Sequence, residues 1–267
     1  MASSATALKT RRRGSGPTAD TVAPPRNDQV DWNLFNPRIY HAHNYRTLRD
    51  DDRQLVTHVR DFFGSVRIAP TAKGLDIGPG ANLYPSLSML PFCGQVELVE
   101  YSAANIAWLR RQQLWLRRFD RSWDKFWSLY GEHPAYAPFV RANRPLDAFR
   151  EKATVSPGSI FELKRARWDV GTMFFVACSL SADRGEFFRG VSRFLEALRP
   201  GAPFAAAFMT GSSGYEIKNQ TFPAFPVNAD IIKHALTRHA PGAEITPIKT
   251  DLRPEVGMVL ATGFRRR

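Results

Sequence analysis

The chain has 267 residues, 43% of them hydrophobic, which is enough for one domain with a sizeable core. No apolar run approaches the roughly 20 residues needed to cross a bilayer, so we expect no contact with a membrane. The two cysteines are too few for a disulfide framework or a metal cage, so we expect a cytoplasmic protein without a bound metal. The net charge of +12 suggests a nucleic-acid partner, but half of it lies at the ends of the chain, +3 in residues 1–28 and +3 in Arg265, Arg266 and Arg267.

The N-terminal region divides into two parts. Residues 1–28 are rich in Ala, Ser, Thr, Pro, Arg and Gly and have no apolar periodicity, which predicts a disordered basic tail. Residues 29–267 form the single predicted domain. Its first part, residues 29–65, has a helical pattern, and Asp50 is expected to begin a helix there.

A glycine turn follows the first predicted strand, Gly74–Ile77. Asp76 stands at the end of this strand, and Gly78 and Gly80 come directly after it. The glycines allow a sharp bend and the close approach of a ligand, and the following helix start offers free N–H groups. A carboxylate before the turn suits a cationic ligand, such as the sulfonium and aminopropyl part of S-adenosylmethionine (SAM). An ordinary strand-to-helix turn with a capping Asp explains the short motif equally well.

A second carboxylate ends the next strand. Gln95–Val99 is apolar and β-branched, and Glu100 follows it, 24 residues after Asp76. A carboxylate at this place can accept two hydrogen bonds from a ribose diol, so the pair favours a nucleoside-bearing cofactor. A nicotinamide dinucleotide is an alternative, but its usual motif needs a third glycine where this chain has Leu83.

A basic helix is predicted after the second strand. The stretch from Asn105 to Arg121 carries +4, with arginine pairs seven residues apart beside tryptophans. This pattern is typical of an amphipathic helix with one solvated basic face, and it favours packing over RNA binding. We assign residues 106–155 to a helical insertion.

The second half of the chain alternates strands and helices. The apolar run from Trp168 to Ser181 predicts a strand buried on both faces, with its carboxyl end at the edge where open α/β sheets bind ligands. After it we expect a helix over residues 187–198, a strand over 203–208, a helix over 228–239 and strands over 244–248 and 256–263. This alternation predicts a doubly wound, mostly parallel α/β sheet.

Four motifs together carry a resemblance to a known family. They are Phe35-Asn36-Pro37-Arg38 with Tyr40 and Tyr45; Asp76-Ile77-Gly78 with Gly80 and Tyr84; Glu100-Tyr101-Ser102 with Asn105; and Ser212-Ser213 with Tyr215, Gln220, Phe222 and Pro226. The chain resembles the family of nicotinamide, phenylethanolamine and indolethylamine N-methyltransferases, as a bacterial member. The resemblance implies a class I SAM-dependent methyltransferase fold, Rossmann-like, with an N-terminal helical lid. The tail and residues 110–155 have no counterpart.

The resemblance also implies a set of cofactor contacts. Tyr40 and Tyr45 would contact the methionine end of SAM, and Glu100 and Asn105 its ribose and adenine side. The full set is Tyr40, Tyr45, Asp76, Gly78, Pro79, Gly80, Asn82, Tyr84, Glu100, Tyr101, Asn105, Ser159, Ile160 and Phe175. The reaction product would be S-adenosylhomocysteine.

The acceptor is expected to differ from those of the amine-methylating relatives. In those relatives, a carboxylate holds the amine of the acceptor. The corresponding residue in this chain is Phe208, which is followed by Met209. A buried ammonium without a partner is costly, so we expect a small aromatic or heterocyclic acceptor, indole-like or tryptamine-like, methylated on N or C in bacterial specialised metabolism. The predicted substrate contacts are Phe174, Phe208, Met209, Ser212, Tyr215 and Phe222, and the predicted positioning residues in catalysis are Tyr40, Tyr215 and Glu255. The same aromatic side chains fit the core equally well.

Two other functions stay open at this point. The charge suggests a nucleic-acid methyltransferase, but the N/D-P-P-Y type motif that holds a flipped base is replaced by Ser179-Leu180-Ser181-Ala182-Asp183. A noncatalytic SAM-binding protein would show the same cofactor motifs. In all three cases we expect a monomer or a weak dimer.

Overall fold

The computed structural model describes residues 25–114, 121–253 and 255–267. Most of the predicted tail, residues 1–24, lies outside this part, as do Arg117 and Arg118 of the predicted basic helix. Residues 25–28 are described, and Asn27 begins a short 3₁₀ helix, η1 (Asn27–Gln29). Among the described residues, no helix has the length and apolarity that a membrane span requires.

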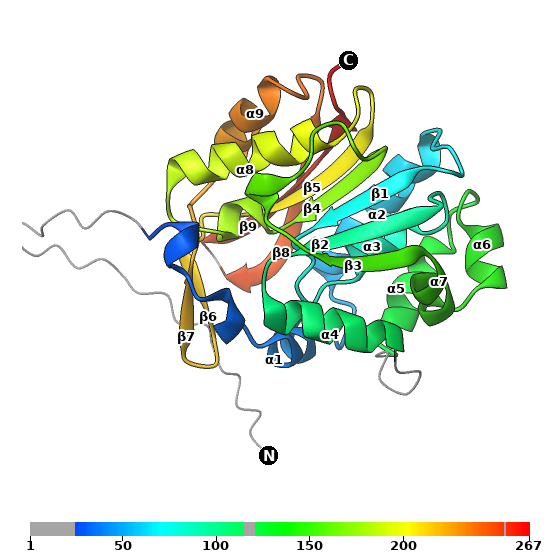
Figure 1. The fold of residues 1–267 in the computed structure, drawn as a ribbon, viewed down its shortest axis with the longest axis horizontal. Coiled ribbons are helices and arrows are strands. Elements are labelled where there is room, and N and C mark those ends of the chain that lie inside the picture. Colours follow the sequence, from blue (N-terminus) through cyan, green and yellow to red (C-terminus); the bar gives the residue numbers. More distant parts are fainter. Residues whose placement is uncertain (1–24, 115–120, 254) are drawn as a thin grey trace, which may run out of the picture.

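A seven-stranded sheet forms the centre of the molecule (Figure 1), in the order β3-β2-β1-β4-β5-β9-β8. The first five of these strands are parallel, and β9 and β8 extend the sheet in antiparallel fashion. The strands are β1 (Lys73–Ile77), β2 (Gln95–Glu100), β3 (Ala153–Pro157), β4 (Val170–Phe174), β5 (Pro203–Thr210), β8 (Glu244–Arg253) and β9 (Val256–Phe264). The predicted doubly wound, mostly parallel sheet is therefore confirmed.

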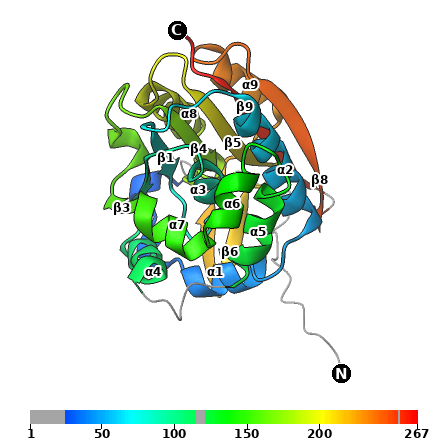
Figure 2. The same cartoon turned by 90° about the vertical axis from the view of Figure 1, so that its right-hand side faces the viewer.

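Helices cover both faces of the sheet. One face carries α2 (Asp50–Ser65), α3 (Tyr84–Met89) and α5 (Trp123–Tyr130), and the other carries α8 (Arg184–Ala197) and α9 (Ala229–Thr237), as Figures 1 and 2 show. Side chains along a strand alternate between the two faces. Each half of the core is therefore built from every second residue of a strand.

The chain reverses its direction of travel across the sheet between β1 and β4. From β1 it proceeds outward to β2 and β3, and after the return to β4 it proceeds the other way to β5. In open α/β sheets, ligands bind outside the carboxyl ends of the strands at such a switch point. Ile77 ends β1 and Phe174 ends β4, so the segments after these residues lie at the switch point.

The predicted insertion over residues 106–155 covers most of the connection from β2 to β3, but its last three residues, 153–155, belong to β3 itself. The connection contains α4 (Ala103–Leu114), α5, α6 (Ala137–Ala142) and α7 (Pro145–Lys152). Because α4 packs against β2 and β3, it serves as the ordinary crossover helix, and the additional helices follow it. α5 then packs against α2 and α3 on one face of the sheet.

The predicted helical segment over residues 29–65 also has two parts. η2 (Trp32–Leu34) and α1 (Pro37–Asn44) lie near the carboxyl edge of the sheet, and Asn36 caps α1 by accepting hydrogen bonds from two backbone N–H groups. α2 instead packs against β8, α3 and α5.

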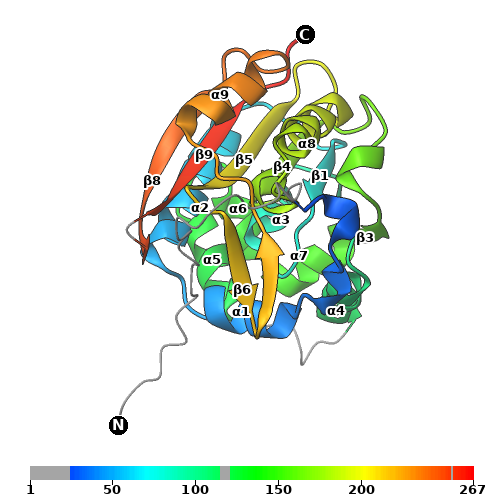
Figure 3. The ribbon, with the colours of Figure 1, turned by 90° about the vertical axis from the view of Figure 1, so that its left-hand side faces the viewer.

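One strand is shorter than predicted, and the structure contains a hairpin that was not predicted. β4 ends at Phe174, because Phe175 has a left-handed φ of +60° and Ala177–Ser179 form a 3₁₀ turn, η4. β6 (Gly214–Ile217) and β7 (Gln220–Pro223) pair only with each other. Figure 3 shows this hairpin beside the N-terminal segment in blue.

Candidate functional site

The glycine turn after β1 forms the base of the site. Gly78 and Gly80 have φ values of +62° and +56°, a region that non-glycine residues seldom adopt. The Gly78 N–H donates to the Val99 carbonyl at 2.8 Å, which fixes the turn against β2. A Cβ at Gly78 would come within 2.8 Å of Val176, whereas a Cβ at Gly80 would meet only Asn105, at 3.8 Å. Gly80 thus leaves open space beside the backbone.

Glu100 lies at the end of β2 and connects it to this turn. Its carboxylate accepts hydrogen bonds from the Gly80 N–H at 2.9 Å and from the Ser102 N–H at 2.8 Å. Burial raises the pKa of Glu100, and these backbone N–H groups oppose the rise. Each oxygen has a second lone pair, so the carboxylate can accept further hydrogen bonds from a ligand.

Two amide side chains near the turn have buried atoms without a hydrogen-bond partner within the described protein. These atoms are Asn105 Oδ1 and Asn82 Nδ2. Buried polar atoms are nearly always paired in native proteins, so an unpaired atom at a cavity indicates a polar ligand. Both residues line a cavity at this edge of the sheet.

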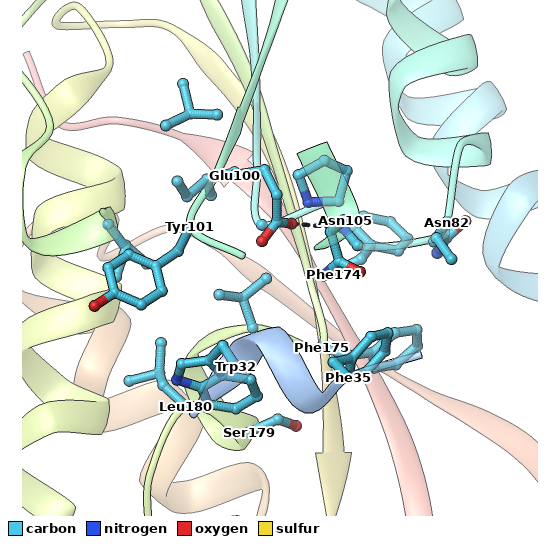
Figure 4. Close-up of a pocket in the computed structure, with 18 of the residues that line it drawn as sticks. Trp32, Phe35, Asn82, Glu100, Tyr101, Asn105, Phe174, Phe175, Ser179 and Leu180 are labelled. Atoms are coloured by element: carbon cyan, nitrogen blue, oxygen red, sulfur yellow. Dashed lines mark hydrogen bonds between the residues drawn. The ribbon is translucent and has the colours of Figure 1, made fainter. Parts of the chain in front are cut away.

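A cavity lies at the carboxyl ends of β1, β2 and β4, and it encloses about 840 Å³ of space, part of which is open to solvent. Figure 4 shows the Glu100 carboxylate directed into it, with Trp32 and Phe35 on the other side. The predicted cofactor residues that line it are Tyr40, Tyr45, Gly78, Pro79, Gly80, Asn82, Glu100, Tyr101, Asn105, Ser159, Ile160 and Phe175. Residues from distant parts of the sequence therefore meet in one cavity.

Aromatic rings from two segments close one side of the cavity. In the N-terminal segment, Phe35 and Tyr40 have ring centroids 5.0 Å apart. Phe222 of the hairpin stacks between Trp32 at 5.5 Å and Tyr215 at 5.4 Å. We call these five residues the aromatic roof. Trp32, Phe35, Tyr40 and Tyr215 line the cavity directly, while Phe222 supports them from behind.

Two predicted cofactor residues do not reach the cavity. Leu75 and Ile77 of β1 face α8, so the intervening Asp76 faces α3, where its carboxylate accepts hydrogen bonds from Ser86 and Thr172. Burial raises the pKa of Asp76 to about 7. Tyr84 packs in the core with its ring stacked 5.3 Å from Phe126. Neither residue lines the cavity.

Phe208, the residue on which the acceptor prediction rested, also lies in the core. It is fully buried and packs against Phe187 of α8. The reason is strand alternation, since Ala205 and Ala207 of β5 face the α2 side and Phe208 faces the other side. The structure therefore does not bring Phe208 to the cavity.

The remaining predicted acceptor and catalytic residues separate into two groups. Phe174 and Tyr215 line the cavity. Met209 and Ser212 do not: the Met209 N–H donates to Cys178 Sγ, and the Ser212 hydroxyl donates to the Gly214 carbonyl. Glu255 is exposed and also lies outside the cavity lining.

Several lining residues were missed from the sequence. Asn27, within the predicted tail, accepts a hydrogen bond from Trp32 Nε1 at 3.0 Å, and its backbone N–H donates to Glu186 of α8 at 2.7 Å. Ser179 and Leu180 of the η4 turn also line the cavity. The motif at residues 35–38 could have indicated this part of the cavity lining, since it contains Phe35 and lies close to Trp32 in the sequence.

Comparisons with known proteins identify the fold. No protein-family description and no curated protein matches the sequence. Among solved structures, the chain is similar to the N-methyltransferase NodS from Bradyrhizobium japonicum WM9 in complex with S-adenosyl-L-homocysteine, at 14% identity and a TM-score of 0.50, over 82% of this chain and 90% of NodS. It is also similar to the [4+2]-cyclase SpnF, at 12% identity and a TM-score of 0.55, over 92% of this chain and 99% of SpnF. The fold is that of class I SAM-dependent methyltransferases, and the narrower resemblance to the nicotinamide and phenylethanolamine enzymes stays a prediction.

Proposed function

We propose that this protein is a SAM-dependent methyltransferase acting on a small aromatic or heterocyclic acceptor. The observation that carries the proposal is the arrangement of Gly80, Glu100 and Asn105 around one cavity. A left-handed glycine leaves space for a ligand, a buried carboxylate keeps free lone pairs, and a buried amide oxygen has no partner within the described protein. The complex of NodS with S-adenosyl-L-homocysteine supports the same cofactor for this fold.

The residues that line the cavity offer the polar groups that SAM requires. Glu100 would accept hydrogen bonds from the ribose hydroxyls, while Ser159, Ile160 and Tyr101 line the side expected for adenine. Tyr40 and Tyr45, with Asn82, line the side expected for the methionine portion. When bound, SAM supplies a sulfonium methyl group that leaves a neutral thioether behind.

The acceptor class follows from the charges around the cavity. Glu100 is the only Asp, Glu, Lys or Arg among the described residues that line it, and its carboxylate is tied to Gly80 and Ser102. A protonated alkylamine would thus lack a carboxylate of its own, and burying it would be costly. Trp32, Phe35 and Tyr215 instead offer ring faces to a flat, neutral acceptor.

The task of the chain itself is to position the acceptor and exclude water. Methyl transfer needs the nucleophilic atom about 3 Å from the methyl carbon and in line with the breaking bond. Tyr40, which borders the methionine side, and Tyr215 each bring a ring and a hydroxyl to the cavity, so we assign them the positioning role. The electron-rich face of Tyr40 also favours a neighbouring cation.

The proposal is tested first by calorimetric titration of the protein with SAM, S-adenosylhomocysteine and NAD. We expect binding of the first two and none of NAD. A coupled assay for S-adenosylhomocysteine release over indoles, hydroxyquinolines and arylethylamines then tests transfer, with the neutral heterocycles expected as the better acceptors.

Two outcomes would redirect the proposal. SAM binding without release of S-adenosylhomocysteine from any acceptor would favour a role other than methyl transfer, and the similarity to a cyclase makes this outcome informative. Transfer to tRNA that weakens steeply between 50 and 200 mM salt would instead favour a nucleic-acid substrate.

A further inference from the structure

Glu186, in the first turn of α8, is 3% exposed and lies outside the cavity lining. In a capping box, a glutamate at this position accepts a hydrogen bond from the backbone N–H of the residue that caps its own helix. Here the N–H of that capping residue, Asp183, donates to the Ser181 hydroxyl instead. Glu186 Oε2 accepts from the backbone N–H of Asn27 at 2.7 Å. A carboxylate of α8 therefore holds the N-terminal segment.

Two arginines complete the surroundings of this carboxylate. Glu186 Oε1 lies 3.1 Å from Arg189 of the same helix and 3.7 Å from Arg26, the residue before Asn27. A buried carboxylate that loses its partners is costly. Detachment of the N-terminal segment would remove Arg26 and Asn27 together and leave Glu186 with Arg189 alone among its described partners. The charge of Glu186 thus favours the attached segment.

The side chain of Asn27 continues the link into the cavity. Its Oδ1 accepts a hydrogen bond from Trp32 Nε1 at 3.0 Å, and both residues line the cavity. One face of the Trp32 ring stacks on Phe222, with an angle of 21° between the ring planes. Trp32 is therefore fixed at its edge by Asn27 and on one face by Phe222, and Figure 4 shows it across the cavity from Glu100.

The backbone of the N-terminal segment has further attachments on both sides. The Ala182 N–H, just before α8, donates to the Pro25 carbonyl, and the Ala103 N–H at the start of α4 donates to Asn33 Oδ1, each at 3.0 Å. These bonds hold the segment independently of the Glu186 carboxylate. Loss of that carboxylate should therefore move the indole ring without detaching the segment.

We infer that Glu186 is a positioning residue for the acceptor. It holds Asn27, Asn27 holds the indole N–H of Trp32, and the ring fixed in this way receives a flat acceptor by stacking. The inference rests on the proposed function and adds to it a residue that touches neither the acceptor nor SAM. Stacking needs ring faces that are nearly parallel, so a fixed ring in the aromatic roof selects flat acceptors.

The binding experiment compares four forms of the full-length protein: wild type, Glu186→Ala, Glu186→Gln and Glu196→Ala. Indole and 8-hydroxyquinoline are titrated by calorimetry into the complex with S-adenosylhomocysteine. Glu186→Ala should weaken their binding by about 3- to 10-fold. Glu186→Gln should retain most of the affinity, because its amide oxygen can still accept from Asn27. Glu196→Ala is the control, since Glu196 lies at the other end of α8 and pairs with Arg165 and Arg193. The affinity for S-adenosylhomocysteine should be equal in all four.

Nuclear magnetic resonance of the ¹⁵N-labelled protein tests the link without cofactor or acceptor. The indole N–H signal of Trp32 is identified by its absence from Trp32→Phe. Glu186→Ala and Asn27→Ala should both move this signal to lower proton chemical shift, because its hydrogen bond is weakened or lost. The signal of Trp168, whose indole N–H donates to Glu97 at 3.1 Å, should stay in place.

Three results would overturn the inference. An unmoved Trp32 signal in Glu186→Ala would show that Glu186 does not position the ring. A moved signal with unchanged binding of both probes would show that the ring does not receive the acceptor. A loss of affinity for S-adenosylhomocysteine in Glu186→Ala would place Trp32 at the cofactor instead. If the wild type binds no S-adenosylhomocysteine, the proposed function fails, and the Trp32 signal distinguishes this failure because it is measured without either ligand.

Discussion

The Glu100 carboxylate accepts a hydrogen bond from the Gly80 N–H at 2.9 Å, across the gap between the end of β2 and the turn after β1. One side chain thereby both shapes the glycine turn and faces the cavity. Its second oxygen is held by Ser102 at 2.8 Å, so the orientation of the carboxylate is set before any ligand arrives.

Glu100→Gln should weaken SAM binding by about 10- to 100-fold, which corresponds to the 1.5–3 kcal/mol of a hydrogen bond to a charged group. The amide nitrogen of Gln accepts no hydrogen bond, so one of the donors to Glu100, namely Gly80, Ser102 or a ribose hydroxyl, would lose its acceptor. Calorimetric titration measures the change. Glu97→Gln is the control, because Glu97 lies on the same strand and binds Arg167 and Trp168 outside the cavity. Equal SAM affinities in the two variants would contradict the assignment of Glu100.

The two glycines of the turn should respond differently to alanine. Gly80→Ala places a methyl group in open space, so we expect a stability loss of roughly 1–2 kcal/mol from the left-handed backbone and a clear loss of SAM affinity. Gly78→Ala also brings a methyl group to 2.8 Å from Val176, and its stability loss should be larger. Thermal unfolding and calorimetry separate the two effects. A Gly80→Ala variant with wild-type SAM affinity would show that the ligand does not approach this turn.

The main elements of the fold could be predicted from the sequence because each has a strong local pattern. The helix that begins at Asp50 is amphipathic, and the strand that ends at Glu100 contains the apolar residues Val96, Leu98 and Val99. β4 was predicted too long, since the apolar run continues past Phe174 although Phe175 adopts φ +60°. The hairpin was missed because β6 and β7 have four residues each, too few for a periodic signal.

More of the predicted cofactor residues than of the predicted acceptor residues line the cavity. Gly78, Gly80 and Glu100 are placed by short-range geometry at the ends of two adjacent strands. The position of Phe208 depends instead on which face of β5 it occupies, and a shift by one residue exchanges core and cavity. Asp76 likewise faces the core because of its place in the alternation along β1.

Phe208→Ala should therefore lower stability without changing the preference among acceptors. Removal of a fully buried Phe typically costs 3–5 kcal/mol. Tyr215→Ala is the contrasting variant, because Tyr215 lines the cavity and stacks on Phe222. Tyr215→Ala should clearly raise the KM for the acceptor, with only a small decrease in the free energy of unfolding. Denaturant unfolding measures the stability of both variants, and steady-state kinetics measures their preference among acceptors. An altered acceptor preference in Phe208→Ala would show that Phe208 does influence acceptor binding.

Stability should fall as the pH rises from about 4 to about 8. The pKa values of Asp52 and Asp76 are raised from 3.8 to about 8 and about 7, so the folded protein holds two protons that the unfolded chain releases near pH 4. Below pH 4 both states hold these protons, and above pH 8 both have lost them, so the loss from these groups is confined to the interval between.

Asp52→Asn should reduce this loss and be more stable than the wild type above pH 8. Urea unfolding at pH 5, 7 and 9 measures the effect. Asp61→Asn on the exposed side of α2 is the control, since Asp61 lies beside Arg60 at the surface. Parallel stability curves for wild type and Asp52→Asn would mean that Asp52 ionises in the folded state as readily as in water.

Within the described part of the chain, the strands of the hairpin β6–β7 pair only with each other and add no ladder hydrogen bond to the seven-stranded sheet. Tyr215 and Phe222 can therefore be exchanged for other side chains while the ladder that carries Gly80 and Glu100 is left intact. In evolutionary terms, the two ends of the cavity are separable units. Substitutions in the eight residues of β6 and β7 could change the acceptor during evolution. A designer could likewise replace the hairpin and leave the residues proposed to bind the cofactor unchanged.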